Sequence, residues 1–296
     1  RARVLVAVCL ACAVGLVLAS SGRADERANE RVSFLSVSAD GETRDADRSL
    51  RQYLEREAGV RFGADVLEYR QVIERLVAWD PADGVIVART TPYVQVAAEL
   101  LGAELEVLAT YVSESTGSTT YHSYYVARKD ELHPNPTPAD VIAFISGSKE
   151  RVRFRYHNLF STSSFFLPSL HFRDNGVFHM RASTQSLVAI DAARLETDSS
   201  SDLVRAVAAG AEADLVAVWD DTRARFVGDG PHADEARDLV FVQLPWAIPN
   251  DLLVCSRSAS AEFKDEIRSS IRSMSPGEIA VGDFSHWVDI RDAMEA

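Results

Sequence analysis

STSSFFLP, residues 161–168, places four consecutive hydroxyl side chains directly before an apolar run. Ser and Thr are favoured at helix N-caps because their oxygens accept hydrogen bonds from the free N–H groups of the first turn. Those N–H groups and the helix dipole also attract anions. Ser161, Thr162 and Ser163 therefore form a candidate binding point for a tetrahedral oxyanion, although an isolated run of this kind is also typical of a simple helix cap. Pro168 predicts that the helix is short or kinked.

Strand-like and helix-like segments alternate on both sides of this stretch. Before it, β-prone or apolar runs typical of strands lie at residues 32–38, 60–67, 84–88, 105–112, 121–128 and 151–156. Segments typical of helices lie between them, at residues 45–57, 69–79, 93–101 and 139–144. After it, strands are expected at residues 213–219, 239–244 and 252–255, and helices at 202–209, 259–272 and 287–296. This order predicts an α/β protein with mostly parallel sheets.

The length of the chain, 296 residues, predicts two lobes, since a single core rarely grows that large. The proline-rich segment at residues 130–140 indicates a crossing between the lobes, and the return crossing is expected within residues 222–234. We therefore predict one discontinuous lobe, from residues 31–125 and 228–296, and a second from residues 126–227.

The N-terminus is typical of a targeting segment. Arg1 and Arg3 precede residues 4–19, which are uncharged and mostly apolar. This run is shorter than the ~20 residues that a membrane-spanning helix needs. We predict that residues 1–24 are a signal peptide and that the mature protein, beginning near Asp25, is periplasmic or secreted. An uncleaved signal anchor is the alternative.

The charge and the cysteines exclude several classes of protein. The net charge of −13 argues against nucleic-acid binding, which needs clustered Lys and Arg. An anion site here must instead rely on local donors, because the overall field repels anions. After signal cleavage only Cys255 remains, so no intramolecular disulfide forms, and Cys255 is expected in a buried strand. The sequence carries no zinc-like Cys/His spacing and no Gly-rich nucleotide loop, so we expect no metal and no cofactor.

The stretch STSSFFLP also resembles a motif of a known family. It is similar to the Ser-Thr-Ser-Gly-aromatic-Leu-x-Pro motif of periplasmic phosphonate/phosphite-binding proteins of ABC importers, with Ser164 in the place of Gly. Residues 121–128 resemble the family's Tyr-x-Ser-x-x-x-x-Arg signature, and residues 248–251 match its Ile-Pro-x-Asp turn. The resemblance implies the type II periplasmic-binding-protein-like fold, with two lobes, each a mostly parallel sheet flanked by helices, and a cleft between them.

The resemblance also implies a set of ligand-binding residues. Carried over position by position, they are Tyr69, Tyr121, Ser161, Thr162, Ser163, Asp221 and Asp251. In the family the tyrosines and hydroxyls serve the phosphonate head, and acids at the last two positions contact the amine of aminoalkylphosphonates. Two departures are evident: Ser201 stands where the family often has His, and the segment at residues 180–199 is longer than usual.

The leading interpretation is a non-catalytic, monomeric solute-binding protein that captures a small phosphorus oxyanion for an ABC permease. A ligand-sensing ectodomain with the same cleft is an open alternative. A secreted serine hydrolase using Ser161 or Ser163 is disfavoured because the chain lacks Gly-x-Ser-x-Gly. If Asp221 and Asp251 both face the cleft, ligands with an amine or a protonated oxygen should bind better than dianions.

Overall fold

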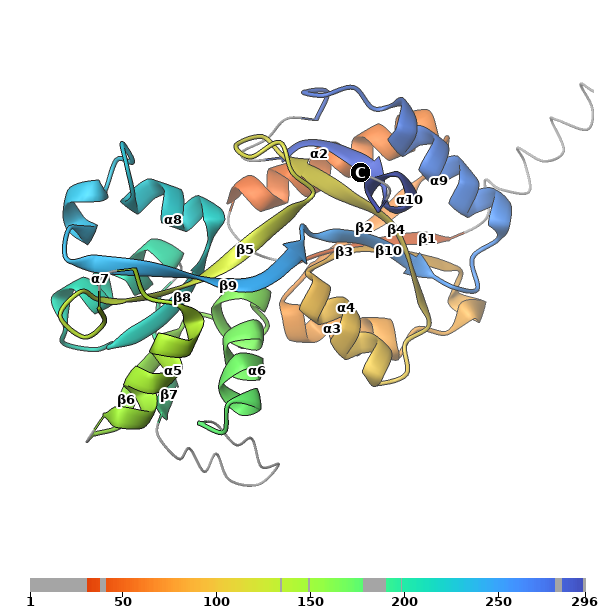
Figure 1. The fold of residues 1–296 in the computed structure, drawn as a ribbon. Helices are drawn as coiled ribbons and strands as arrows, with labels where there is room; N and C mark the ends of the chain where they lie inside the picture. Colours follow the sequence, from red (N-terminus) through yellow and green to blue (C-terminus); the bar gives the residue numbers. More distant parts are fainter. Residues whose placement is uncertain are drawn as a thin grey trace, which may run out of the picture.

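The computed structural model describes residues 31–37, 41–133, 135–148, 150–177, 190–197, 199–279 and 284–294. The expected signal peptide lies outside these residues. The described chain forms two α/β lobes, each built on one β-sheet flanked by helices (Figure 1). Among the described residues, no helix combines the length and the apolar character needed to cross a membrane.

The first lobe contains a six-stranded sheet in the order β11-β4-β10-β3-β1-β2. Its strands are β1 (Val32–Val37), β2 (Phe62–Leu67), β3 (Val85–Thr90), β4 (Leu105–Ser113), β10 (Leu252–Ser256) and β11 (Phe284–Asp289). Its helices are α2 (Gly41–Glu57), α3 (Tyr69–Val77), η1 (Pro81–Asp83), α4 (Pro92–Leu100), α9 (Ala261–Ser273) and α10 (Ile290–Ala293). The expected strand and helix order of residues 32–113 is confirmed.

The second lobe contains a five-stranded sheet in the order β7-β6-β8-β5-β9. Its strands are β5 (Thr120–Arg128), β6 (Val152–Tyr156), β7 (Ile190–Arg194), β8 (Leu215–Trp219) and β9 (Leu239–Pro249). Its helices are α5 (Pro138–Gly147), η2 (Thr162–Phe166), α6 (Leu167–Asp174), α7 (Ser200–Ala209), α8 (Asp220–Phe226) and η3 (Ala233–Ala236).

The expected two-lobed α/β fold is confirmed, and both of its sheets are mixed rather than purely parallel. In the first lobe, β1 runs parallel to β2 and β3, whereas β10 is antiparallel to β3 and β4, and β11 is antiparallel to β4. In the second lobe, β6 runs parallel to β7 and β8, whereas β5 is antiparallel to β8 and β9. The strand–helix–strand units supply the parallel pairs. The antiparallel pairs come from the strands that enter or leave a lobe.

The lobes are joined through the connections from β4 to β5 and from β9 to β10, and β5 and β9 pair with each other along most of their lengths in the second sheet (Figure 1). The chain crosses at residues 114–119 and again at residues 250–251, and the buried Asn250 fastens both crossings. Its Nδ2 donates to the carbonyls of Tyr111 (3.0 Å) and Ser118 (2.9 Å). The predicted lobe boundaries are therefore displaced, because β5 and all of β9 belong to the second sheet.

The C-terminal segment differs from the expected helix at residues 287–296. Trp287 lies in β11, where the side chains of Ser285, Trp287 and Asp289 alternate into the interior. Only the short α10 follows. A buried face that includes Ser and Asp does not produce the apolar alternation of an ordinary strand, which explains the wrong expectation.

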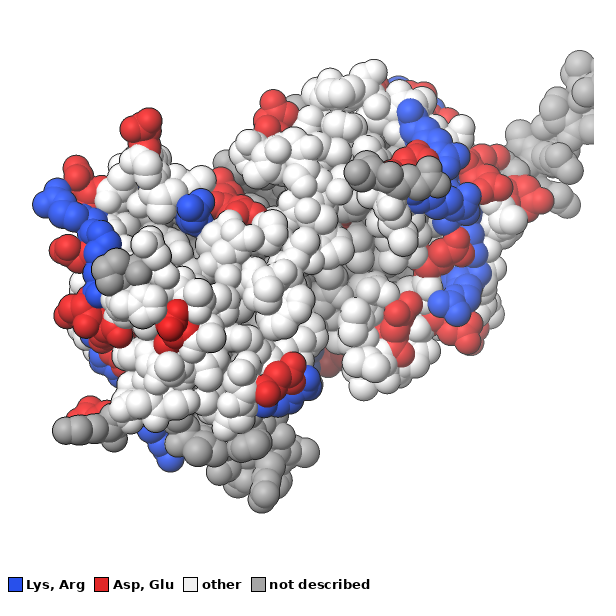
Figure 2. Space-filling model, in the orientation of Figure 1, with Lys and Arg blue, Asp and Glu red and all other residues white. Residues whose placement is uncertain are grey.

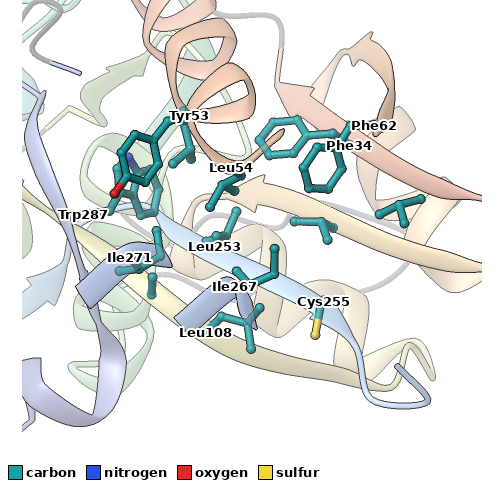
Figure 3. Close-up of a cluster of buried hydrophobic side chains, with 14 of the residues drawn as sticks. Phe34, Tyr53, Leu54, Phe62, Leu108, Leu253, Cys255, Ile267, Ile271 and Trp287 are labelled. Atoms are coloured by element: carbon teal, nitrogen blue, oxygen red, sulfur yellow. The ribbon is translucent and has the colours of Figure 1, made fainter. Parts of the chain in front are cut away.

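The core of the first lobe contains the one free cysteine of the described chain (Figure 3). Cys255 of β10 is fully buried, as expected, and lies with Ile267 of α9 and Leu54 of α2 in one apolar cluster. Each fully buried side chain of this size stabilises the fold by about 1.5–3 kcal/mol. Burial raises the pKa of the Cys255 thiol to about 12, so it remains a protonated apolar group.

Candidate ligand-binding site

The hydroxyl stretch starts a wide helical turn between the two lobes. Ser161 is the N-cap, and its Oγ accepts a hydrogen bond from the backbone N–H of Ser164 (3.1 Å). Its carbonyl accepts from the N–H of Phe166, five residues on (3.0 Å), which is the pattern of a π-helix. Pro168 has no N–H to donate to the carbonyl of Ser164, so the turn continues into α6 with altered geometry. The expected short or kinked helix is confirmed.

Tyr121 of β5 lies against this turn. Its phenol lies close enough to the side chains of Thr162 and Ser163 that both act to lower its pKa, against the larger effect of burial. Ser123, two residues along β5 and fully buried, donates from Oγ to the carbonyl of Ser163 (2.7 Å). Strand β5 therefore places one phenol beside the two hydroxyls and fixes the backbone that carries them.

The phenol of Tyr121 keeps its proton and therefore remains able to donate a hydrogen bond. Burial raises its pKa far above the ordinary value, and the negative charge of Asp251 raises it further. Both effects disfavour the phenolate. An oxyanion placed here meets neutral O–H donors, and no proton has to leave the protein for them to act.

The first lobe contributes α3 and α4 to the same place. The N–H of Tyr93 in α4 donates to Thr162 Oγ1 (3.3 Å), which leaves the hydroxyl proton of Thr162 available. Tyr69, the first residue of α3, lies near enough to Tyr121 to contribute to the raised pKa of that phenol. Phe160 stacks on both Tyr69 and Tyr93, with 6.3 Å between ring centroids in each pair. The hydroxyl cluster therefore lies where the two lobes touch.

The two predicted acidic residues, Asp221 and Asp251, are paired with different arginines. Asp221 in α8 lines, with Tyr121 and Asn250, a cavity of about 10 Å³, which has room for about one water molecule. Its carboxylate is paired with Arg225 one helical turn later (2.9 Å), and the arginine is half exposed. Asp251 follows β9 and interacts electrostatically with Tyr121.

Asp251 is paired with a buried arginine that the sequence analysis did not single out. Arg89, at the carboxyl end of β3, is 2% exposed and contacts Asp251 through Nη1 and Asp47 of α2 through Nε. Burial opposes the charge on Arg89, yet the two carboxylates raise its pKa above the ordinary value. Burial also raises the pKa of Asp251, against the opposing effect of Arg89. One sequence feature could have pointed to Arg89: it is a charged residue in an otherwise apolar strand, and a buried charge needs partners.

Tyr93 and Ser123 were also missed as neighbours of the cluster. The departure at Ser201 lies at the start of α7, where its N–H donates to Ser199 Oγ (3.1 Å). Much of the longer segment expected at residues 180–199 lies outside the described residues. Among the residues that are described, no group of three or more His, Cys, Asp or Glu could hold a metal ion.

Two α/β lobes joined by two crossings of the chain form the architecture of periplasmic binding proteins. A family model described as ABC transporter, phosphonate, periplasmic substrate-binding protein matches residues 32–290. The chain therefore belongs to the family of periplasmic substrate-binding proteins of ABC phosphonate transporters. No curated protein sequence matches the chain.

Solved structures of similar proteins support the fold. A binding-protein component of an ABC phosphonate transporter from Pseudomonas aeruginosa is 17% identical with a TM-score of 0.57, over 90% of this chain and 86% of that one. PhnD1 from Prochlorococcus marinus, in complex with methylphosphonate, is 15% identical with a TM-score of 0.60, over 90% and 98% of the two chains. A Xanthomonas citri protein bound to ATP is 16% identical with a TM-score of 0.61, over 90% and 95%.

Proposed function

We propose that this protein captures a phosphonate or similar phosphorus oxyanion at the hydroxyl cluster and delivers it to an ABC permease. The observation that supports this most is the position of Tyr121, whose phenol lies beside the Thr162 and Ser163 hydroxyls at the contact between the lobes. Neutral donors bind an anion reversibly, and hinge closure around a ligand is the usual motion of two-lobed binding proteins. The methylphosphonate bound to PhnD1 is the chemistry that the cluster fits.

We further propose that the protein is a non-catalytic monomer of the periplasm. Ser164 is the one serine of the stretch whose hydroxyl meets a histidine, His157 Nδ1 at 3.3 Å. No hydrogen bond of the described chain joins His157 to a carboxylate, and burial lowers the pKa of His157. A hydrolase would need an acid to orient that imidazole, so binding is the better supported activity.

Calorimetric titration with methylphosphonate tests the proposal. Thr162→Ala, Ser163→Ala and Tyr121→Phe each remove one donor to a charged ligand, so each should weaken binding roughly 10- to 100-fold. Ser161→Ala should weaken binding similarly and also cost about 1 kcal/mol of stability, because its Oγ caps the turn.

Ser164→Ala is the matched control, since this hydroxyl lies in the same turn but contacts His157. It should leave the affinity unchanged. Wild-type affinity in Thr162→Ala, Ser163→Ala and Tyr121→Phe together would remove the cluster from the binding site.

A further inference from the structure

Arg89 carries a buried donor that the protein does not use. Its Nε and Nη1 contact Asp47 and Asp251, but its Nη2 is buried without a hydrogen-bond partner among the residues that the structure describes. A buried, charged donor without a partner costs free energy. An arginine held firmly by two carboxylates with its third nitrogen free is therefore suited to a partner that arrives with a ligand.

The location of Arg89 connects it to the hydroxyl cluster. Strand β3 ends at Thr90, and α4 begins at Pro92, close to the Tyr93 N–H that reaches Thr162. Arg89 interacts electrostatically with Tyr69, and its partner Asp251 interacts with Tyr121. The guanidinium is thus paired with a carboxylate whose charge acts on Tyr121 of the cluster.

The pairing also changes what Asp251 can do. Oδ2 of Asp251 already accepts from the buried guanidinium of Arg89, which a second acid, Asp47, also holds, so a ligand ammonium group would have to share this carboxylate with it. It would also approach a like charge at short range, where exclusion of water makes repulsion strong. Asp251 is therefore poorly suited to hold an amine, although the sequence alone suggested that role.

We propose that Arg89 binds an oxygen of the ligand through Nη2 and, by holding Asp251, excludes ligands that carry an amino group. The site then takes phosphorus oxyanions without a cationic substituent, such as methylphosphonate. This inference rests on the proposed function and specifies its ligand class.

The test compares methylphosphonate with 2-aminoethylphosphonate by calorimetry at neutral pH. Wild-type protein should bind methylphosphonate at least about tenfold more tightly. Arg89→Gln removes the donor and frees Asp251, so it should weaken methylphosphonate roughly 10- to 100-fold and strengthen 2-aminoethylphosphonate, which reverses the ranking. Arg89→Lys keeps the charge but lacks the fork of donors, and it should weaken methylphosphonate while keeping the ranking.

Arg268→Gln is the matched control. Arg268 is also a buried arginine between two acids, Glu106 and Asp289. Glu106 pairs with Cys255, near the far end of β10 from Asp251, so this arginine lies away from the cluster. Its loss should lower stability and leave the ligand ranking unchanged.

The outcomes separate this inference from the proposed function. Equal or tighter wild-type binding of 2-aminoethylphosphonate would overturn the role of Arg89 while leaving phosphonate capture intact. A folded Arg89→Gln variant with the wild-type ranking would do the same. If Arg89→Gln does not fold, the role of Arg89 is decided by two other results. These are the relative affinities of wild-type protein for the two phosphonates and the methylphosphonate affinity of Arg89→Lys. If neither phosphonate binds wild-type protein, the proposed function fails and this inference fails with it.

Discussion

The hydroxyl groups of the proposed site are of two kinds, proposed ligand donors and supports for those donors. Ser163 illustrates the difference, because its hydroxyl faces Tyr121 while its carbonyl accepts from Ser123 Oγ. The supporting residue Ser123 and the neighbouring phenol of Tyr121 both come from β5. A support residue should therefore affect stability and affinity together, whereas a hydroxyl elsewhere in the lobe should affect stability alone.

Ser123→Ala tests this distinction. The change leaves the buried carbonyl of Ser163 without its donor, which should cost about 1–3 kcal/mol of unfolding free energy. It should also weaken methylphosphonate binding, because the turn that carries Ser163 is less well held. Denaturant titration and calorimetry on the same variant measure the two effects.

Ser148→Ala is the control for Ser123→Ala. Ser148 Oγ donates to the carbonyl of Phe144 over the same 2.7 Å, at the end of α5. It should lose stability but keep the wild-type affinity. Full affinity in Ser123→Ala would mean that the turn holds its shape without this bond.

At the scale of elements, local patterns predicted most helices and strands, but not their partners. The apolar run of β3 and the hydroxyl stretch at residues 161–168 are local signals, and both elements formed as expected. The contacts of Arg89 with Asp47 and Asp251 span 42 and 162 positions. No periodicity reports which distant acid will meet a buried arginine, so this part of the site could not be predicted.

Asp214 ties β6 to the start of β8 and gives the second lobe a pH dependence. Burial works to raise its pKa, but hydrogen bonds from the side chain and backbone of Arg153 outweigh burial and lower it. The closest contact is Arg153 Nη2 to Asp214 Oδ1, at 2.6 Å. Because the folded pKa is depressed, the stabilisation is present above the ordinary value of 3.8 and is lost as the pH falls through the folded value.

Asp214→Asn should therefore cost about 1–2 kcal/mol of unfolding free energy at neutral pH, and the difference from wild type should vanish well below pH 3.8. Denaturant titrations at both pH values measure it. Asp191→Asn is the control. Asp191 pairs with Arg155, which lies on β6 as Arg153 does, but the side chain of Asp191 is half exposed. An Asp214→Asn deficit that persists in acid would show that its cost is not electrostatic.

At the scale of the whole molecule, the lobes meet through the crossing strands and through a stack of aromatic rings. Phe160 of the second lobe packs against the apolar cluster of the first lobe that contains Leu35 and Val94. Tyr93 stacks on Phe166 as well, with 4.2 Å between ring centroids. The face in Figure 2 has most of its charged side chains toward the outer ends of the lobes, and its middle is largely uncharged. Apolar contact rather than ion pairing is therefore expected to favour the closed arrangement.

Phe160→Leu tests that expectation by removing two stacked ring pairs, with Tyr69 and Tyr93. Each aromatic pair is worth about 0.5–1.5 kcal/mol, so the closed arrangement should lose about 1–3 kcal/mol. Apparent affinity falls with the population of the competent state, and methylphosphonate binding should weaken roughly 5- to 100-fold. Small-angle scattering should show a larger radius of gyration for the free variant than for free wild type, and equal radii at saturating ligand.

Phe62→Leu, which removes a ring contact with Phe34 inside the first lobe, should change neither the radius nor the affinity. An unchanged radius and affinity in Phe160→Leu would leave the crossing strands alone to set the arrangement of the lobes.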